Sequence, residues 1–123
     1  MSDIILKKVS GINYTETTLY NIDGGQRLVD TATPTALLAS DGIILFDTSS
    51  LAISIDLPLA SVGKISIPFK DIGANSNTNN ITINRVGSDT IIDSATGQTS
   101  TIISSDGFSG ELLSNGVDTW YLF

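Results

Sequence analysis

The groups with which this chain could do chemistry are its carboxylates, because it contains neither histidine nor cysteine. A Ser-His-Asp or Cys-His nucleophile is therefore excluded, and so are thiolate and imidazole metal sites. Two carboxylates held across a sugar can hydrolyse a glycosidic bond. The candidate pairs are Asp89 with Asp93 and Asp106 with Glu111, but both stand in turn-rich segments where Asp is expected for the turn itself. We therefore expect no catalysis, no cofactor and no metal site.

Several classes of partner are disfavoured by the sequence. Six Lys and Arg against thirteen Asp and Glu give a formal net charge of −7, and the cations are scattered apart from Lys7-Lys8. Phosphate-backbone binding needs clustered cations, so we expect no nucleic-acid partner. The N-terminal sequence lacks the long apolar core of a signal peptide, and the longest apolar runs, Ile43–Phe46 and Ala36–Ala39, are too short to cross a bilayer. We expect a soluble protein with no membrane partner.

Alternating apolar and polar residues predict an all-β protein. This period-two pattern, which places one set of side chains on one face of a strand, occurs over residues 52–57, 64–69, 80–86 and 119–123. The residues that it directs into one core are Ile53, Ile55, Ile65, Ile67, Ile81, Ile83 and Leu122. Further strands are expected at Ile4–Val9, Arg27–Asp30, Gly42–Asp47, Thr90–Asp93, Thr99–Ser104 and Gly110–Leu113. Pro68 cannot donate a ladder hydrogen bond, so strand 64–69 is expected at a sheet edge or to end there.

Turn signals such as Asp41-Gly42, Asp106-Gly107 and Asn115-Gly116 separate these short strands at fairly even intervals. Such punctuation is typical of a sandwich or barrel. We predict a single domain over residues 1–123 with an antiparallel, jelly-roll-like β-sandwich fold. The Asn-rich segment 75–80 leads into the strand-like Ile81–Ile83, and is interpreted either as a surface loop that bonds its own backbone or as a binding loop.

The surface and the last residues both bear on self-association. Charged residues make up only 15% of the chain, so much of the surface is Ser, Thr and Asn. Such a surface occurs where copies pack together and is also ordinary for β-domains. In "DTWYLF" the alternation assigns Trp120 and Leu122 to the core, and Tyr121 and Phe123 to a second apolar surface. A neighbouring subunit would cover that surface most simply, and a loop from residues 1–40 would also serve.

From about residue 41 onward the sequence carries an ordered series of short segments. They are Lys70-Asp71 at a strand end, the Asn-rich loop 75–80, the I-T-I strand 81–83, the segment Gly87–Ile91, and Asn115–Tyr121 with its Trp-Tyr pair. In this order and spacing they resemble a module of tailed-bacteriophage structural proteins, over roughly two thirds of the chain. Residues 41–123 are thus identified as a phage-type β module, and residues 1–40, which have no counterpart in it, as a possible particle-docking segment.

The resemblance implies a virion protein. Such modules resemble the β-sandwich ends of head fibres and tail fibres and the capsid decoration (cement) proteins, which are commonly homotrimers. We expect a homotrimeric decoration protein that binds the major capsid protein and stabilises the capsid exterior. The alternative is a receptor- or glycan-binding module of a head or tail fibre, with a host-surface glycan as partner and an exposed aromatic such as Tyr14 or Tyr20 as the sugar platform.

Overall fold

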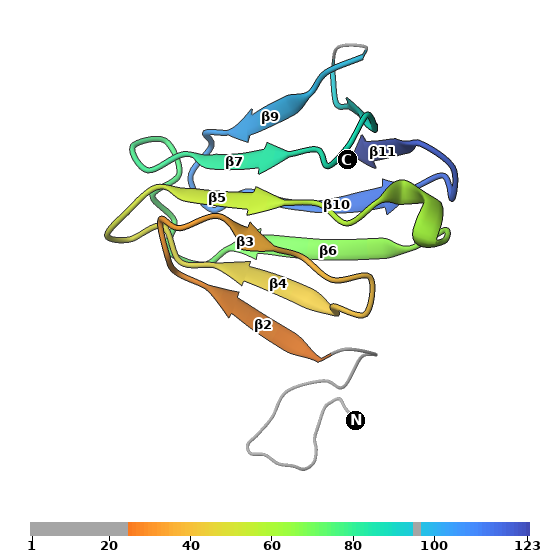
Figure 1. The fold of residues 1–123 in the computed structure, drawn as a ribbon. Coiled ribbons are helices and arrows are strands. Elements are labelled where there is room, and N and C mark those ends of the chain that lie inside the picture. Colours follow the sequence, from red (N-terminus) through yellow and green to blue (C-terminus); the bar gives the residue numbers. More distant parts are fainter. Residues whose placement is uncertain (1–24, 95–96) are drawn as a thin grey trace.

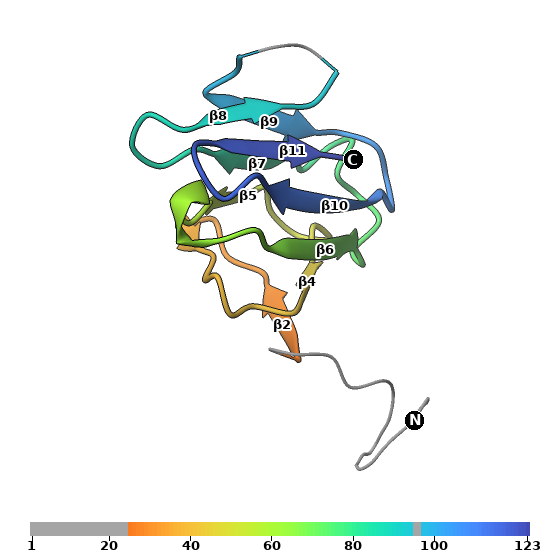
Figure 2. The same ribbon diagram turned by 90° about the vertical axis from the view of Figure 1, so that its right-hand side faces the viewer.

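The computed structural model describes residues 25–94 and 97–123, which form ten strands in two packed sheets. The six-stranded sheet has the order β2 (Gln26–Val29), β4 (Ile43–Phe46), β6 (Ser66–Asp71), β10 (Ser109–Ser114), β11 (Thr119–Leu122) and β8 (Thr90–Ile92) (Figure 2). The four-stranded sheet has the order β3 (Thr35–Ala36), β5 (Ile53–Asp56), β7 (Ile81–Asn84) and β9 (Ser100–Ile103) (Figure 1). The predicted all-β sandwich is confirmed.

Helical structure in the described part of the chain is confined to a single short 3-10 turn, η2 (Ala60–Val62). Nothing helical in residues 25–94 and 97–123 is long and apolar enough to span a membrane.

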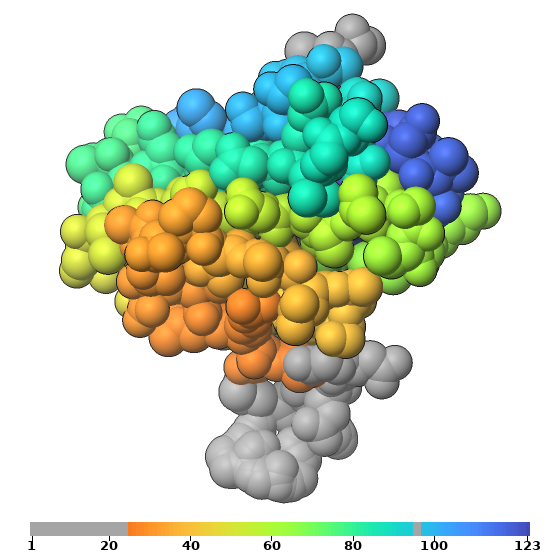
Figure 3. Space-filling view, viewed as in Figure 1, coloured from red at the N-terminus to blue at the C-terminus, as the bar shows by residue number. Residues whose placement is uncertain are grey.

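The strands from β2 to β7 alternate between the two sheets, so the chain winds as a flattened coil. Neighbours within a sheet are one turn of this coil apart and run parallel, and consecutive turns appear as successive colour bands in the space-filling view (Figure 3). With the β8–β11 pair, five of the eight strand pairings described are parallel. The antiparallel prediction was therefore wrong for these pairs, and the jelly-roll-like connection is not confirmed. Parallel neighbours need a crossover, and here a strand of the opposite sheet supplies it.

The antiparallel pairs, β7–β9, β6–β10 and β10–β11, involve the strands that follow the coil. The turn between β10 and β11 was predicted from its Asn-Gly sequence. The side-chain oxygen of Asn115 accepts hydrogen bonds from the backbone N–H groups of Val117, Asp118 and Thr119 at 2.8, 2.9 and 3.1 Å. Gly116 adopts a φ of 80°, which glycine reaches without steric cost. The Asn-Gly pair thus reverses the chain and sets β10 against β11.

The core lies between the two sheets and consists of the inward-facing residues of both. Of the residues predicted there, Ile53, Ile55, Ile67, Ile81 and Ile83 are buried, and Ile65 and Leu122 pack against them while partly buried. Trp120 is fully buried and donates its Nε1–H to the carbonyl oxygen of Pro58 at 3.0 Å. Each large apolar side chain buried in this way stabilises the fold by about 1.5–3 kcal/mol.

Pro68 lies inside the six-stranded sheet, so the expectation that its strand would be at an edge, or end there, was wrong. β6 has β4 on one side and β10 on the other, and Pro68 is opposite Glu111 of β10. The N–H of Glu111 donates instead to the carbonyl oxygen of Phe123, on the far side of β10, at 3.2 Å. On the other side, the β4–β6 ladder begins only at Phe69. The missing N–H of Pro68 therefore leaves no ladder bond unmade.

Residues 1–40 contribute to both sheets, because β2 pairs with β4 and β3 pairs with β5. The particle-docking role suggested for this segment stays a prediction. The strand expected at Ile4–Val9, and Tyr14 and Tyr20, lie outside the described residues.

Candidate interaction site

The four carboxylates considered for catalysis are all hydrogen-bond acceptors within the fold. Their donors are the Ala60 N–H for Asp89, Gln98 and Thr101 for Asp93, the Asn77 N–H for Asp106, and the Ser66 hydroxyl for Glu111. Each contact joins segments that are distant in the sequence or closes a local turn. Within residues 25–94 and 97–123, no group of three or more acidic side chains is placed to hold a metal ion. That the chain is not an enzyme stays a prediction.

A buried carboxylate whose structural role the sequence analysis missed organises one end of the sandwich. Asp71, the last residue of β6, is only 1% exposed. Its oxygens accept hydrogen bonds from the Thr48 hydroxyl at 2.6 Å, and from the N–H groups of Ala74, Ser76 and Gly107 at 3.1, 3.2 and 3.1 Å. One side chain therefore fastens three loops, which follow β4, β6 and β9. The Asp-Ile-Gly turn sequence at 71–73 is the signal that could have indicated it.

The charge of Asp71 is stabilised by these contacts. Burial raises the pKa of its carboxyl, but the hydrogen bonds from Thr48, Gly107 and Ser76 outweigh burial, so the pKa lies below its usual value. A similar arrangement occurs in the loop after β4. There the hydroxyl and the N–H of Ser49 donate to Asp47 and lower the pKa of its carboxyl. Both carboxylates are ionised at neutral pH.

The Asn-rich loop is held to this end of the sandwich by its own amides. Asn79 donates its side-chain N–H to the Thr48 carbonyl oxygen, and Asn80 donates to the Ser76 carbonyl oxygen, both at 2.7 Å. The loop also runs close to the chain after β4: a Cβ at Gly73 would lie 2.3 Å from the backbone nitrogen of Thr48. These contacts favour the interpretation of residues 75–80 as a connector that bonds its own surroundings.

The solvent-facing side of the six-stranded sheet, here called the outer face, carries several apolar side chains on adjacent strands. Leu113 of β10, Tyr121 of β11 and Ile92 of β8 lie in register across three adjacent strands. Phe123 follows β11 and exchanges two backbone hydrogen bonds with Glu111, so it continues the ladder with its side chain on this face. It is 68% exposed. The alternation thus placed Tyr121 and Phe123 correctly, and their role as a subunit interface stays a prediction.

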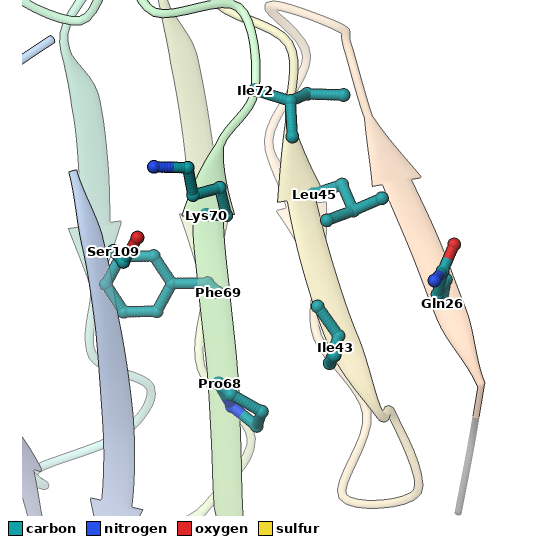
Figure 4. A pocket seen from close by; sticks show the side chains of 8 residues that line it. All are labelled: Gln26, Ile43, Leu45, Pro68, Phe69, Lys70, Ile72 and Ser109. Carbon is teal, nitrogen blue, oxygen red and sulfur yellow. The ribbon is translucent and has the colours of Figure 1, made fainter. Parts of the chain in front are cut away.

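A groove of about 500 Å³ hollows the other half of the outer face. Figure 4 shows Ile43 and Leu45 side by side on β4, between Gln26 of β2 and the residues of β6. The described residues that line it are Gln26, Ile43, Leu45, Pro68, Phe69, Lys70, Ile72 and Ser109. Among these eight only Lys70 is charged, and its Nζ donates to the Gly107 carbonyl oxygen at 2.6 Å. The groove is therefore an apolar depression with one cation at its rim.

The outer face is electrically neutral although the chain is acidic. The outward positions of its six strands carry one cation, Lys70, and one anion, Glu111, against a formal net charge of −7 for the whole sequence. Two copies of the chain repel each other over most of their surface, and least over this face. An apolar, neutral face of this kind is typical of an interaction surface.

The chain was also compared with known proteins. No protein-family model and no curated protein matches it.

Proposed function

We propose that this chain is a structural protein of a tailed-bacteriophage particle, and more specifically a decoration (cement) protein that binds and stabilises the capsid exterior. It acts as a homotrimer, with Tyr121 and Phe123 at the subunit interface. The number three and the location on the particle rest on the resemblance of residues 41–123 to phage virion modules. The outer face supports the self-association.

The observation that carries the proposal is the neutral, apolar outer face on an otherwise acidic domain. Burying such a face against protein removes apolar area from water at about 25 cal/mol per Å² and leaves only one charge of each sign to be paired. A homotrimeric decoration protein makes two kinds of contact, one with its own copies and one with the shell. The outer face serves the first, which leaves the polar remainder of the surface for the second.

The segments that carry the resemblance are structural in this fold, which also supports the proposal. Lys70-Asp71 ends β6, the Asn-rich loop is bound by its amides, Ile81–Ile83 lies in β7, and Asn115–Tyr121 contains the β10–β11 turn and the first residues of β11. A module that shares these segments shares the means of building the sandwich.

The test is made on the phage that encodes the chain. Particles assembled with the gene deleted are heated with a DNA-binding dye, and the temperature of DNA release is compared with that of wild-type particles. We expect release at a lower temperature, restored when the purified chain is added back. Electron microscopy of add-back particles should show it at regular positions on the capsid.

The fibre alternative predicts another outcome. Unchanged DNA release together with impaired adsorption to host cells would contradict the decoration role, and would assign the chain to a receptor- or glycan-binding module instead.

A further inference from the structure

The outer face carries an exposed aromatic side chain and an apolar groove that this side chain cannot reach within one molecule. Phe123 extends β11, whereas most of the described groove lining lies on β4 and β6, two to three strand positions away. Adjacent strands are spaced by 4.7–4.9 Å, so the Phe123 backbone is roughly 10–14 Å from those two strands. Phe123 does not line the groove of its own molecule, so a Phe123 side chain in the groove has to come from another copy.

We propose that the groove accepts Phe123 of a second copy of this chain. This inference rests on the self-association proposed above, and names the contact that makes it. A groove of about 500 Å³ falls within the 300–1,000 Å³ of typical small-molecule pockets, so it has room for a phenyl ring together with a neighbouring side chain. Ile43, Leu45 and Ile72 supply apolar walls, and Ile72 is itself 49% exposed.

Charge complementarity selects a second copy of this chain as the occupant. Glu111 lies directly opposite Phe123 in the β10–β11 ladder, and Lys70 lines the groove. When Phe123 of one copy enters the groove of another, Glu111 travels with it toward Lys70. A contact that is apolar at its centre and pairs opposite charges at its rim favours the correct partner and orientation.

The positions of the two features restrict which assemblies can result. Because both lie on the same face, two copies can insert Phe123 into each other's groove in a two-fold dimer, or each copy can engage the next head-to-tail in a ring or a filament. The proposed homotrimer is the ring with three members, and the number three rests on the resemblance of residues 41–123.

The test uses full-length variants that alter one side of the contact each. Phe123→Asp removes the inserted side chain, and Ile72→Asp alters an exposed wall of the groove without touching the core. Ile102→Asp is the matched control, because Ile102 is 58% exposed in β9 of the opposite sheet. Sedimentation velocity measures the mass at micromolar concentration, and circular dichroism checks the fold.

We expect the wild-type chain and Ile102→Asp to be oligomeric. Each of the other two variants should associate about 30-fold more weakly or worse, as for an interface hot spot. An equimolar mixture of Phe123→Asp and Ile72→Asp should form a one-to-one heterodimer, because the intact groove of the first accepts the intact Phe123 of the second. Lys70→Glu should weaken association, and the double variant Lys70→Glu with Glu111→Lys should restore it.

Three results would overturn the inference. They are a monomeric wild-type chain, variants that keep the wild-type mass, and a mixture that yields no heterodimer. A monomer whose stability falls in Ile72→Asp, independently of concentration, would indicate that residues 1–24 of the same chain cover the groove. The virion role is judged separately, by binding of each purified variant to gene-deleted particles. A wild-type monomer that still binds and stabilises them would retain that role without this contact.

Discussion

Replacing Asp71 by asparagine is expected to lower the free energy of unfolding by about 3–5 kcal/mol. Asparagine has nearly the same shape, but only one of its side-chain oxygens remains. If that oxygen keeps the bonds from Thr48 and Ala74, its amide N–H₂ faces the N–H donors of Ser76 and Gly107. Two buried hydrogen bonds to a charged group are then lost, each worth about 1.5–3 kcal/mol, and the lower desolvation cost of the neutral amide offsets part of the loss.

This loss is large relative to the 5–15 kcal/mol that typically stabilises a domain. It should lower the melting temperature by on the order of 12–20 °C, at about 4 °C per kcal/mol for a chain of this size. Urea unfolding at pH 7, followed by the fluorescence of Trp120, measures the free energy directly. Asp106→Asn is the matched control at the same end of the sandwich. Among the described residues Asp106 accepts one hydrogen bond, from the Asn77 N–H at 2.8 Å, so its variant should change stability by less than about 1 kcal/mol.

The pH dependence separates the charge of Asp71 from its shape. Because the folded-state pKa of Asp71 lies below the usual value, its ionised form stabilises the fold above about pH 4, and this stabilisation is lost as the pH falls through the folded-state pKa. The Asn variant cannot titrate at this position. The difference in unfolding free energy between wild type and variant should therefore be largest at neutral pH and shrink in acid. An equal difference at pH 7 and pH 3, or a neutral-pH loss below 1 kcal/mol, would refute the reasoning.

Three further perturbations probe the scaffold. Gly73→Ala should destabilise by about 1–3 kcal/mol in urea unfolding, because its Cβ would lie 2.3 Å from a backbone nitrogen; wild-type stability would show that the loop shifts freely. Trp120→Phe should cost about 2–4 kcal/mol by the same measurement, since it leaves a cavity and removes the bond to the Pro58 carbonyl. Asp89→Ala should lower the melting temperature in calorimetry by several degrees, because the buried N–H of Ala60 loses its acceptor; an unchanged value would contradict that assignment.

The sequence predicted nine of the ten described strands and most of the core, because both follow from local periodicity, and missed the two-residue strand β3. Residues 53–56 and 81–84 alternate strictly, and their inward isoleucines are buried as expected. The turn at Asn115-Gly116 was equally visible, because its chemistry is contained in a few consecutive residues. Strand alternation and turn chemistry can be predicted without knowing which strand lies next to which in the sheet.

The direction of pairing could not be predicted in the same way. A half-buried strand shows the same alternation whether its neighbour is parallel or antiparallel. Short connections are compatible with reversal within one sheet, yet the segment from Val29 to Thr35 crosses to the other sheet and ends in β3, which was not predicted. The role of Asp71 was missed for a related reason, since its donors come from loops up to 36 residues away in the sequence.

Two segments of the sequence, residues 43–46 and 120–123, have apolar side chains on both faces. The outward side chains of the first line the groove, and the second ends in the exposed Phe123. Residues 43–46 are Ile-Ile-Leu-Phe, with Ile44 and Phe46 in the core and Ile43 and Leu45 lining the groove. Residues 120–123 repeat the arrangement at the other half of the outer face. A strand that is apolar on both sides is typical of one covered on both sides. The core covers the inward side of each segment. In the proposed contact, the outward side of residues 43–46 in one copy is covered by the outward side of residues 120–123 in another.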